Sequence, residues 1–273
     1  TLVQNVPAAG GMALANMVYS TAPKDGSYIG LVRGTVVQEQ IYKDPQVQFD
    51  GPRFAWIGNM NSDYDSCIVW AASGIRSLSD FYARDIVVGA SGAAAQSYSF
   101  PKVYDDLLGM KLKIIVGYPG TPERLVAMER GELTGACGIS TSSLSSTLAT
   151  PLKDGKIRII AQAGAHKDPR YPNVPNILDE AKTPDVRQAL EFMYATLSLG
   201  RPIAAPPETP PDRLAVLRRG LTATLKDSEF LQDAKTVGID IEAADATATG
   251  KLVDQMFATP APIVARIQAA MTP

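Results

Sequence analysis

The feature that most constrains the fold is an alternation of strand-like and helix-like segments along most of the chain. One clear unit is the apolar run at 85–89, followed by a turn of small residues at 90–95 and a helical segment at 97–108. Similar turns follow strand-like runs at 113–117 and 133–139. Such alternation favours an α/β fold over an all-helical or all-strand one.

Other segments extend the same pattern. Further strands are predicted at 2–4, 28–32, 54–58, 67–71 and 157–163. Further helices are predicted at 12–20, 124–130, 209–225, 228–236 and 247–257, with a helical turn at 77–82, an irregular helix at 140–149 and a last helical segment ending at Met271. The helix at 124–130 is preceded by Thr121, Pro122 and Glu123, which suit an N-cap and a first turn.

Composition limits the class of protein. The 273 residues can form one large domain or two lobes, and 45% apolar with 20% charged residues is typical of a globular chain. A formal charge of -2 disfavours nucleic acid as a partner. No run reaches the roughly 18–20 apolar residues that span a bilayer. We therefore expect a soluble chain from which a signal peptide has been removed.

The two cysteines carry no metal-binding pattern. Cys67 and Cys137 lie in separate apolar runs without CxxC spacing or nearby histidines. Buried free thiols are the first prediction, and a disulfide is the alternative. Because neither a Walker A loop nor G-x-G-x-x-G is present, nucleotide binding is disfavoured, and we expect no cofactor and no metal.

The turn from Gly89 to Ser97 is a candidate anion site. Its small residues allow a ligand to approach the backbone, and the helix that follows begins with unpaired amides and a partial positive charge. A purely structural turn is the alternative. The same residues nearly match a G-x-S-x-G nucleophile elbow but lack its last glycine, and the single histidine, His166, is predicted in a surface loop. We expect His166 not to be catalytic.

Two further turns offer hydroxyl groups. Tyr118 and Thr121 follow one strand and either line a pocket or belong to an ordinary Pro-Gly turn. Ser140 and the serines after it either donate to a ligand or cap a helix. Four acidic residues are close in sequence in pairs but lack a metal-ligand pattern, and they are interpreted as solvated charges: Asp63, Asp65, Asp105 and Asp106.

The order of motifs resembles the substrate-binding receptors of tripartite tricarboxylate transporters, also called Bug-type extracytoplasmic receptors. The resemblance covers nearly the whole chain and rests on five segments: V-Q-N-V-P-A-A-G-G at 3–11, A-P-K-D-G-S-Y at 22–28, G-E-L-T-G-A at 131–136, P-R-Y-P-N-V-P-N at 169–176 and L-G-R-P-I-A-A-P-P-E-T-P at 199–210. Family members begin with a strand, a glycine-rich loop and a helix that have no match here, so a truncated sequence or an incomplete first lobe is expected.

The resemblance implies a fold and a function together. The fold would be α/β and type II periplasmic-binding-protein-like, with a ligand cleft between two lobes that two crossings join. Lobe 1 would comprise residues 1–72 and 196–273, and lobe 2 residues 73–195. The protein would be a receptor and no enzyme, delivering a small carboxylate, either a di- or tricarboxylate or an aromatic acid, to integral membrane transporter subunits. We expect it to be periplasmic and monomeric.

The resemblance also implies which residues bind the ligand. Position by position, these are Gly34, Thr35, Ser91, Gly92, Ala93, Ser97, Tyr118, Thr121 and Ser140. Arg201 replaces a usually apolar residue, and it either pairs with a ligand carboxylate or forms a salt bridge at a hinge. An effector-sensing regulatory domain of the same fold is the alternative function, but no basic DNA-binding segment is present. A hydrolase ranks third.

Overall fold

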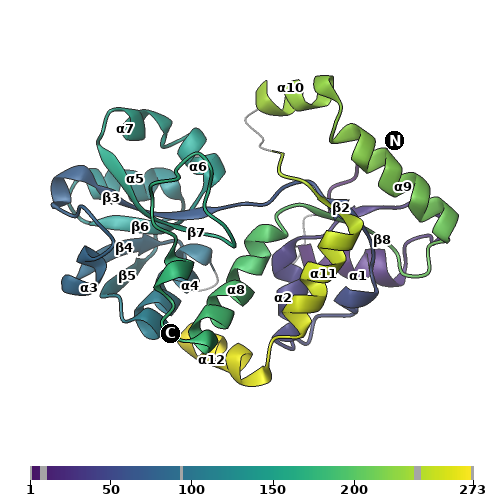
Figure 1. Cartoon of the computed structure of the whole chain (residues 1–273), viewed down its shortest axis with the longest axis horizontal. Coiled ribbons are helices and arrows are strands. Elements are labelled where there is room, and N and C mark those ends of the chain that lie inside the picture. The colour runs from purple at the N-terminus through teal and green to yellow at the C-terminus, as the bar shows by residue number, and fades with distance from the viewer. Residues whose placement is uncertain (1, 7–10, 93–94, 237–240, 272–273) are drawn as a thin grey trace. The chain divides into compact units, whose positions relative to one another are not determined.

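The computed structural model describes residues 2–6, 11–92, 95–236 and 241–271, and its contacts divide the chain into two compact units (Figure 1). Unit 1 comprises Thr1–Ser62 and Ala195–Thr259, and unit 2 comprises Asp63–Tyr194 and Pro260–Pro273. Both units mix one sheet with helices, so the α/β fold class is confirmed.

These bounds differ from the expected lobes at two places. Residues 63–72 belong to unit 2 because the strand they form pairs with two strands of that unit. The C-terminal helix also belongs to unit 2, where it packs on a helix of that unit. The chain therefore passes between the units after residues 62, 194 and 259, and the expected two crossings become three.

Unit 1 is built on a four-stranded antiparallel sheet in the order β1-β8-β2-β9. Helices α1, α9 and α11 pack against its strands. The elements are α1 (Met12–Ser20), β1 (Gly30–Leu31), α2 (Gly34–Ile41), β2 (Ala55–Asn59), β8 (Pro202–Ala205), α9 (Pro211–Thr224), α10 (Ser228–Thr236), β9 (Ala244–Asp245) and α11 (Ala246–Phe257).

Unit 2 is built on a five-stranded mixed sheet in the order β5-β4-β6-β3-β7. Its elements are β3 (Asp65–Trp70), α3 (Asp80–Ala83), β4 (Ile86–Ala90), α4 (Gln96–Val103), a π-helix (Tyr104–Leu108), β5 (Leu112–Val116), α5 (Thr121–Glu129), β6 (Gly135–Ser140), α6 (Thr141–Ser145), α7 (Ala149–Lys153), β7 (Ile157–Ala163) and α12 (Ala261–Met271). Helix α8 (Pro184–Ser198) begins in unit 2 and ends in unit 1.

The strand directions in unit 2 place several turns at one edge. Strand β4 runs parallel to both β5 and β6, so the carboxyl ends of these three strands lie on the same side of the sheet. Helices α5, α6 and α7 lie above the sheet in Figure 1, and α3 and α4 lie below it. Apolar side chains under α5 and α6, including Met128 and Leu144, form the core on the upper face.

A disulfide joins two strands of the unit 2 sheet. Cys67 of β3 is bonded to Cys137 of β6, and both are buried. A bulge between Ser66 and Ile68 brings the cysteine Cα atoms to 4.0 Å from each other. The prediction of free thiols was wrong, because the pairing depends on a strand register that sequence spacing does not reveal.

The structure differs from the predicted elements in three stretches of the chain. No strand forms at residues 2–4, where the side chains of Leu2 and Val3 are 91% and 84% exposed and no described strand pairs with them. The segment after β1, where the sequence analysis placed no helix, contains helix α2. Helix α8 and strand β8 lie in a stretch for which the sequence predicted no element.

Candidate functional site

The carboxyl ends of β4, β5 and β6 form the candidate site. Strand β4 leads through a turn into α4, and β5 leads through a turn into α5, whereas β6 continues directly into α6. Ligands of α/β proteins commonly bind at this side of a sheet, where strand ends and helix N-termini meet. The predicted residues of unit 2 that the structure describes lie in these turns, at the first residues of the helices, or, for Ser140, at the end of β6.

The turn after β4 is organised by Ser97. Its side chain is 5% exposed, and its hydroxyl oxygen accepts a hydrogen bond from the backbone N–H of Ser91 at 3.2 Å. Ser91 itself is exposed and Gly92 is half-buried. Ala93, also predicted in the site, lies outside the described residues. Ser97 therefore holds the turn in place, and its hydroxyl also lies 3.4 Å from the hydroxyl of Ser91.

Strand β6 packs closely against the start of α4. Gly138 has a φ of +67°, and a β-carbon there would lie 2.8 Å from both the nitrogen and the Cα of Ser97. Only glycine allows this conformation and this approach together. The residue type at 138 thus fixes the position of Ser97 and of the turn that it holds.

The turn after β5 holds Tyr118 and Thr121 differently. The backbone N–H of Tyr118 donates to the carbonyl of Ala90, and its half-buried ring packs on Gly89 and the upper core. Thr121 is the first residue of α5, and Gly120 occupies the N-cap position that the sequence assigned to Thr121. The Thr121 side chain is half-buried at this helix N-terminus.

Arg124, which the sequence analysis did not select, lies beside this turn. Its side chain is 6% exposed and donates to three neutral oxygens: the carbonyls of Gly120 and Cys137 at 3.3 and 3.2 Å, and the hydroxyl of Thr121 at 3.0 Å. No carboxylate oxygen of a described residue lies within 4.0 Å of the guanidinium. Among the described residues, the buried cation at these strand ends therefore has no ion-pair partner.

Ser140 is the last residue of β6 and the N-cap of α6. Its hydroxyl accepts from the backbone N–H of Ser143 at 3.3 Å and lies 3.0 Å from the hydroxyls of Ser142 and Ser143. This geometry supports the helix-capping alternative. A direct role of Ser140 in binding stays a prediction.

Asp65 corrects the interpretation of the acidic residues. It is the first residue of β3, lies in register with Ser140, and is 2% exposed, although the sequence predicted a solvated charge. Burial, together with the nearby carboxylate of Asp63, raises the pKa of Asp65 to about 7, and Arg124 opposes the rise. Asp106 is exposed as expected, and Asp105 and Asp63 are half-buried.

The remaining predicted residues belong to unit 1. Gly34 and Thr35 begin α2, and a β-carbon on Gly34 would lie 2.6 Å from both the Cβ and the carbonyl oxygen of Leu199. Packing alone thus explains the glycine. Arg201 is exposed, and its guanidinium donates to the carbonyl of Gly200 at 2.7 Å. Ligand contact by Gly34, Thr35 or Arg201 stays a prediction.

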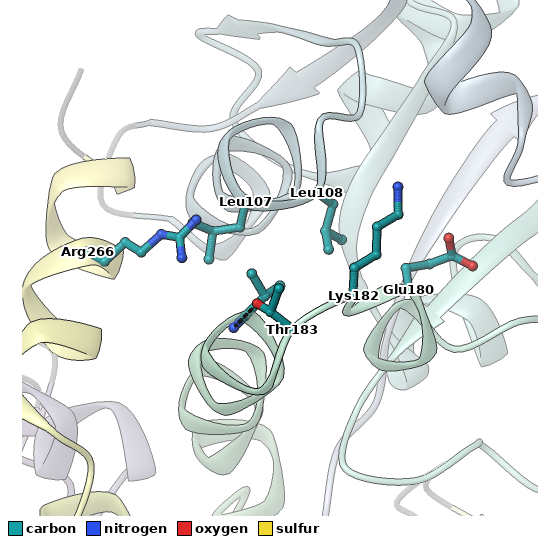
Figure 2. Close-up of a pocket in the computed structure, with 7 residues that line it drawn as sticks. Leu107, Leu108, Glu180, Lys182, Thr183 and Arg266 are labelled. Atoms are coloured by element: carbon teal, nitrogen blue, oxygen red, sulfur yellow. Dashed lines mark hydrogen bonds between the residues drawn. The ribbon is translucent and has the colours of Figure 1, made fainter.

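Unit 2 also has a hollow of about 260 Å³ away from the predicted residues (Figure 2). Its lining comes from the π-helix, from a 3-10 helix at Ile177–Glu180, and from α8 and α12. Glu180 accepts from the hydroxyl of Tyr82, and Thr183 accepts from the backbone N–H of Val186. None of the predicted binding residues lines this hollow.

The sequence matches one protein family over nearly its whole length. The family described as "Tripartite tricarboxylate transporter family receptor" matches residues 1–269. The chain belongs to this family of receptors. The resemblance seen in the motifs is thereby confirmed, and the family and fold are those of substrate-binding receptors. No curated protein shows significant sequence similarity to this family member.

Solved structures of similar fold include other receptors. A solute-binding protein of the same family from Polaromonas, without ligand, superimposes with a TM-score of 0.76 at 17% identity, covering 98% of this chain and 86% of that one. MatC from Rhodopseudomonas palustris with bound malate superimposes with a TM-score of 0.56 at 18% identity, and the match covers 97% of this chain and 85% of that one. An R. palustris protein with adipate superimposes with a TM-score of 0.62 at 15% identity, and the match covers 95% of this chain and 83% of that one. These identities establish the fold only.

Two other features of the described residues concern the helices and the single histidine. Across the described residues, none of the helices combines the length and the apolar character needed to cross a membrane. His166 is exposed in the loop after β7, as the sequence predicted.

Proposed function

We propose that this chain is an extracytoplasmic solute-binding receptor that captures a small carboxylate, a di- or tricarboxylate or an aromatic acid, and delivers it unchanged to a tripartite membrane transporter. The observation that carries the proposal is the edge of unit 2 where α4 and α5 begin beside the buried Arg124. Helix N-termini and a guanidinium both attract carboxylates.

The parts of the site act on an anion in different ways. Backbone amides at the start of α4 and α5 supply hydrogen-bond donors, and the Ser91 hydroxyl adds a side-chain donor at the surface. Thr121 accepts from Arg124, which leaves its own hydroxyl proton free to donate to a ligand oxygen. Binding by such neutral donors recognises an acid without activating it for reaction.

Related receptors support the ligand class. Malate and adipate occupy the R. palustris proteins of similar fold, and both are dicarboxylates. The buried disulfide supports a location outside the cytoplasm, since disulfides persist in oxidising compartments. We propose that the protein is a periplasmic monomer.

A thermal-shift screen tests the proposal. The purified chain is heated with malate, adipate, citrate, benzoate and their neutral amides, because a ligand that binds only the folded state raises the melting temperature. One acid class should raise the midpoint while its amide does not. A midpoint that no acid raises, in a chain shown to be folded by circular dichroism, would sink the proposal. NMR spectra of the bound acid after incubation should show it unchanged.

A further inference from the structure

Asp65 lies at the same edge of the sheet as the candidate site. It is paired in register with Ser140, the last residue of β6, and with Ala163, the last residue of β7. Because β6 runs parallel to β4, this is also the edge at which α4 and α5 begin. Asp65 is thus a buried acid among the strand ends that the proposed ligand approaches.

The carboxyl group of Asp65 has an oxygen without a partner. Atom Oδ2 exposes less than 1 Å², and no described residue forms a hydrogen bond with it. The titratable groups that face Asp65 are the carboxylate of Asp63 before β3, the guanidinium of Arg124 on α5, and the hydroxyls of Tyr104 and Tyr194. An ionised carboxyl group in these surroundings is costly, whereas a protonated one is not.

Arg124 is the cation whose charge the Asp65 carboxylate partly offsets. Its three hydrogen bonds go to neutral oxygens, so its charge is not cancelled by contact with a carboxylate. Ionised Asp65 and Arg124 attract each other through the buried edge of the sheet. The net charge that this pair presents to the starts of α4 and α5 therefore depends on whether Asp65 holds its proton.

We propose that Asp65 is a positioning residue that sets the affinity of the site for anions through Arg124. When Asp65 is protonated, the pair carries one positive charge and attracts a carboxylate. When Asp65 ionises, the pair is neutral and the attraction weakens. This inference rests on the proposed function and adds to it that an anion binds together with a proton taken from the solvent.

Asp65 gains and loses its proton near neutral pH, so the affinity for anions should change in this range. Burial and the Asp63 carboxylate place the pKa of Asp65 at about 7, and a bound anion raises it further. Between pH 6.5 and 8.5 affinity should therefore fall as pH rises, about tenfold, which is within the range of typical coupling between sites. Malate and adipate stay ionised over this interval, so their own titration does not produce the change.

Calorimetric titration with malate and adipate at pH 6.5, 7.5 and 8.5 tests the inference. The Kd of the wild-type chain should rise about tenfold over this interval. In Asp65→Asn the Kd should stay near the wild-type value at pH 6.5 at every pH. Asp154→Asn, a change at an exposed residue of the same unit, should keep the wild-type pH dependence.

The outcomes separate the two proposals. Binding that is independent of pH in the wild type, or equally pH-dependent in Asp65→Asn, overturns the inference and leaves the receptor function standing. Absence of binding of malate and adipate at every pH overturns the dicarboxylate part of the proposed function. A ligand-free measurement keeps the inference testable in that case: an NMR titration of the Asp65 carboxyl carbon should give a midpoint near 7. In folded Arg124→Met the midpoint should be higher, and a midpoint near 4 in the wild type overturns the inference.

Discussion

The backbone of Ser97 lies where a side chain on Gly138 would have to stand, with 2.8 Å between the Ser97 Cα and the β-carbon position. This contact links a residue inside β6 to the start of α4, two elements that are far apart in the sequence. A change at Gly138 should therefore act on the candidate site as well as on stability.

Gly138→Ala should lower the free energy of unfolding by about 2–3 kcal/mol, through left-handed strain and displacement of α4. Affinity for the carboxylate should fall severalfold. Gly155→Ala is the matched control, because Gly155 has a similar φ of +69° but nothing within 4 Å of its β-carbon position. The Gly155→Ala variant should lose only about 1–2 kcal/mol of unfolding free energy and should bind the carboxylate as the wild type does. Equal effects of the two variants, measured by urea unfolding and calorimetry, would contradict the assigned role.

Loss of the disulfide should destabilise unit 2. The bond closes a separation of 70 residues, so replacing both cysteines by alanine should lower the free energy of unfolding by about 2–4 kcal/mol. Dithiothreitol should lower the melting temperature of the wild-type chain and leave that of the double variant unchanged. A wild-type melting temperature that does not respond to the reductant under unfolding conditions would show that the bond does not form.

Asp65 should make stability depend on pH in a particular direction. Below about pH 4, Asp65 is protonated in both the folded and the unfolded protein. Between about pH 4 and 7, Asp65 loses its proton only in the unfolded protein, so the free energy of unfolding falls as pH rises. Asp65→Asn should remove this contribution and be more stable than the wild type at pH 8 by about 1–3 kcal/mol. Urea unfolding of both proteins, measured between about pH 4 and pH 8, checks this prediction. The exposed Asp154→Asn serves as control, and a destabilised Asp65→Asn at pH 8 would count against a raised pKa.

Removing the hydroxyls at the helix starts should weaken binding. Thr121→Val keeps the shape of the side chain but removes the oxygen that accepts from Arg124, and Ser97→Ala removes the acceptor for the Ser91 N–H. Each should cost about 1–3 kcal/mol of binding free energy, measured by calorimetry. Thr150→Val, at an exposed position on α7, should bind as the wild type does. Unchanged affinity in both site variants would remove these residues from the site.

Much of the fold was predictable because local signals agree with it. The structure gives α1, β7 and α10 the bounds expected from the sequence, since turn residues and periodic apolar positions mark their ends. Helix α8 was missed for the opposite reason. Leu190, Phe192, Met193 and Tyr194 are consecutive or nearly so and all buried, so no single apolar stripe distinguishes the helix.

The sequence indicates those parts of the candidate site that backbone turns form, but it does not indicate the buried charged residues beside them. Ser91, Ser97 and Thr121 follow strand ends, and strand ends are visible in the sequence. Arg124 occurs among charged residues, and only its helical spacing to the buried Ala127 and Met128 indicates that it points inward. Asp65 gives no such signal, because its environment comes from β6, β7, α5 and two tyrosines distant in sequence.

The C-terminal helix has a consequence for how the chain is made. Helix α12 packs on α4 through a face that buries Ile263, Val264 and Ile267, yet it is separated from the rest of unit 2 by Ala195–Thr259. During translation, the nascent unit 2 therefore waits for some 65 residues of the other unit before its last apolar surface is covered. Until then the apolar surface that α12 covers stays exposed, so unit 2 completes its folding only after the second segment of unit 1 has been made.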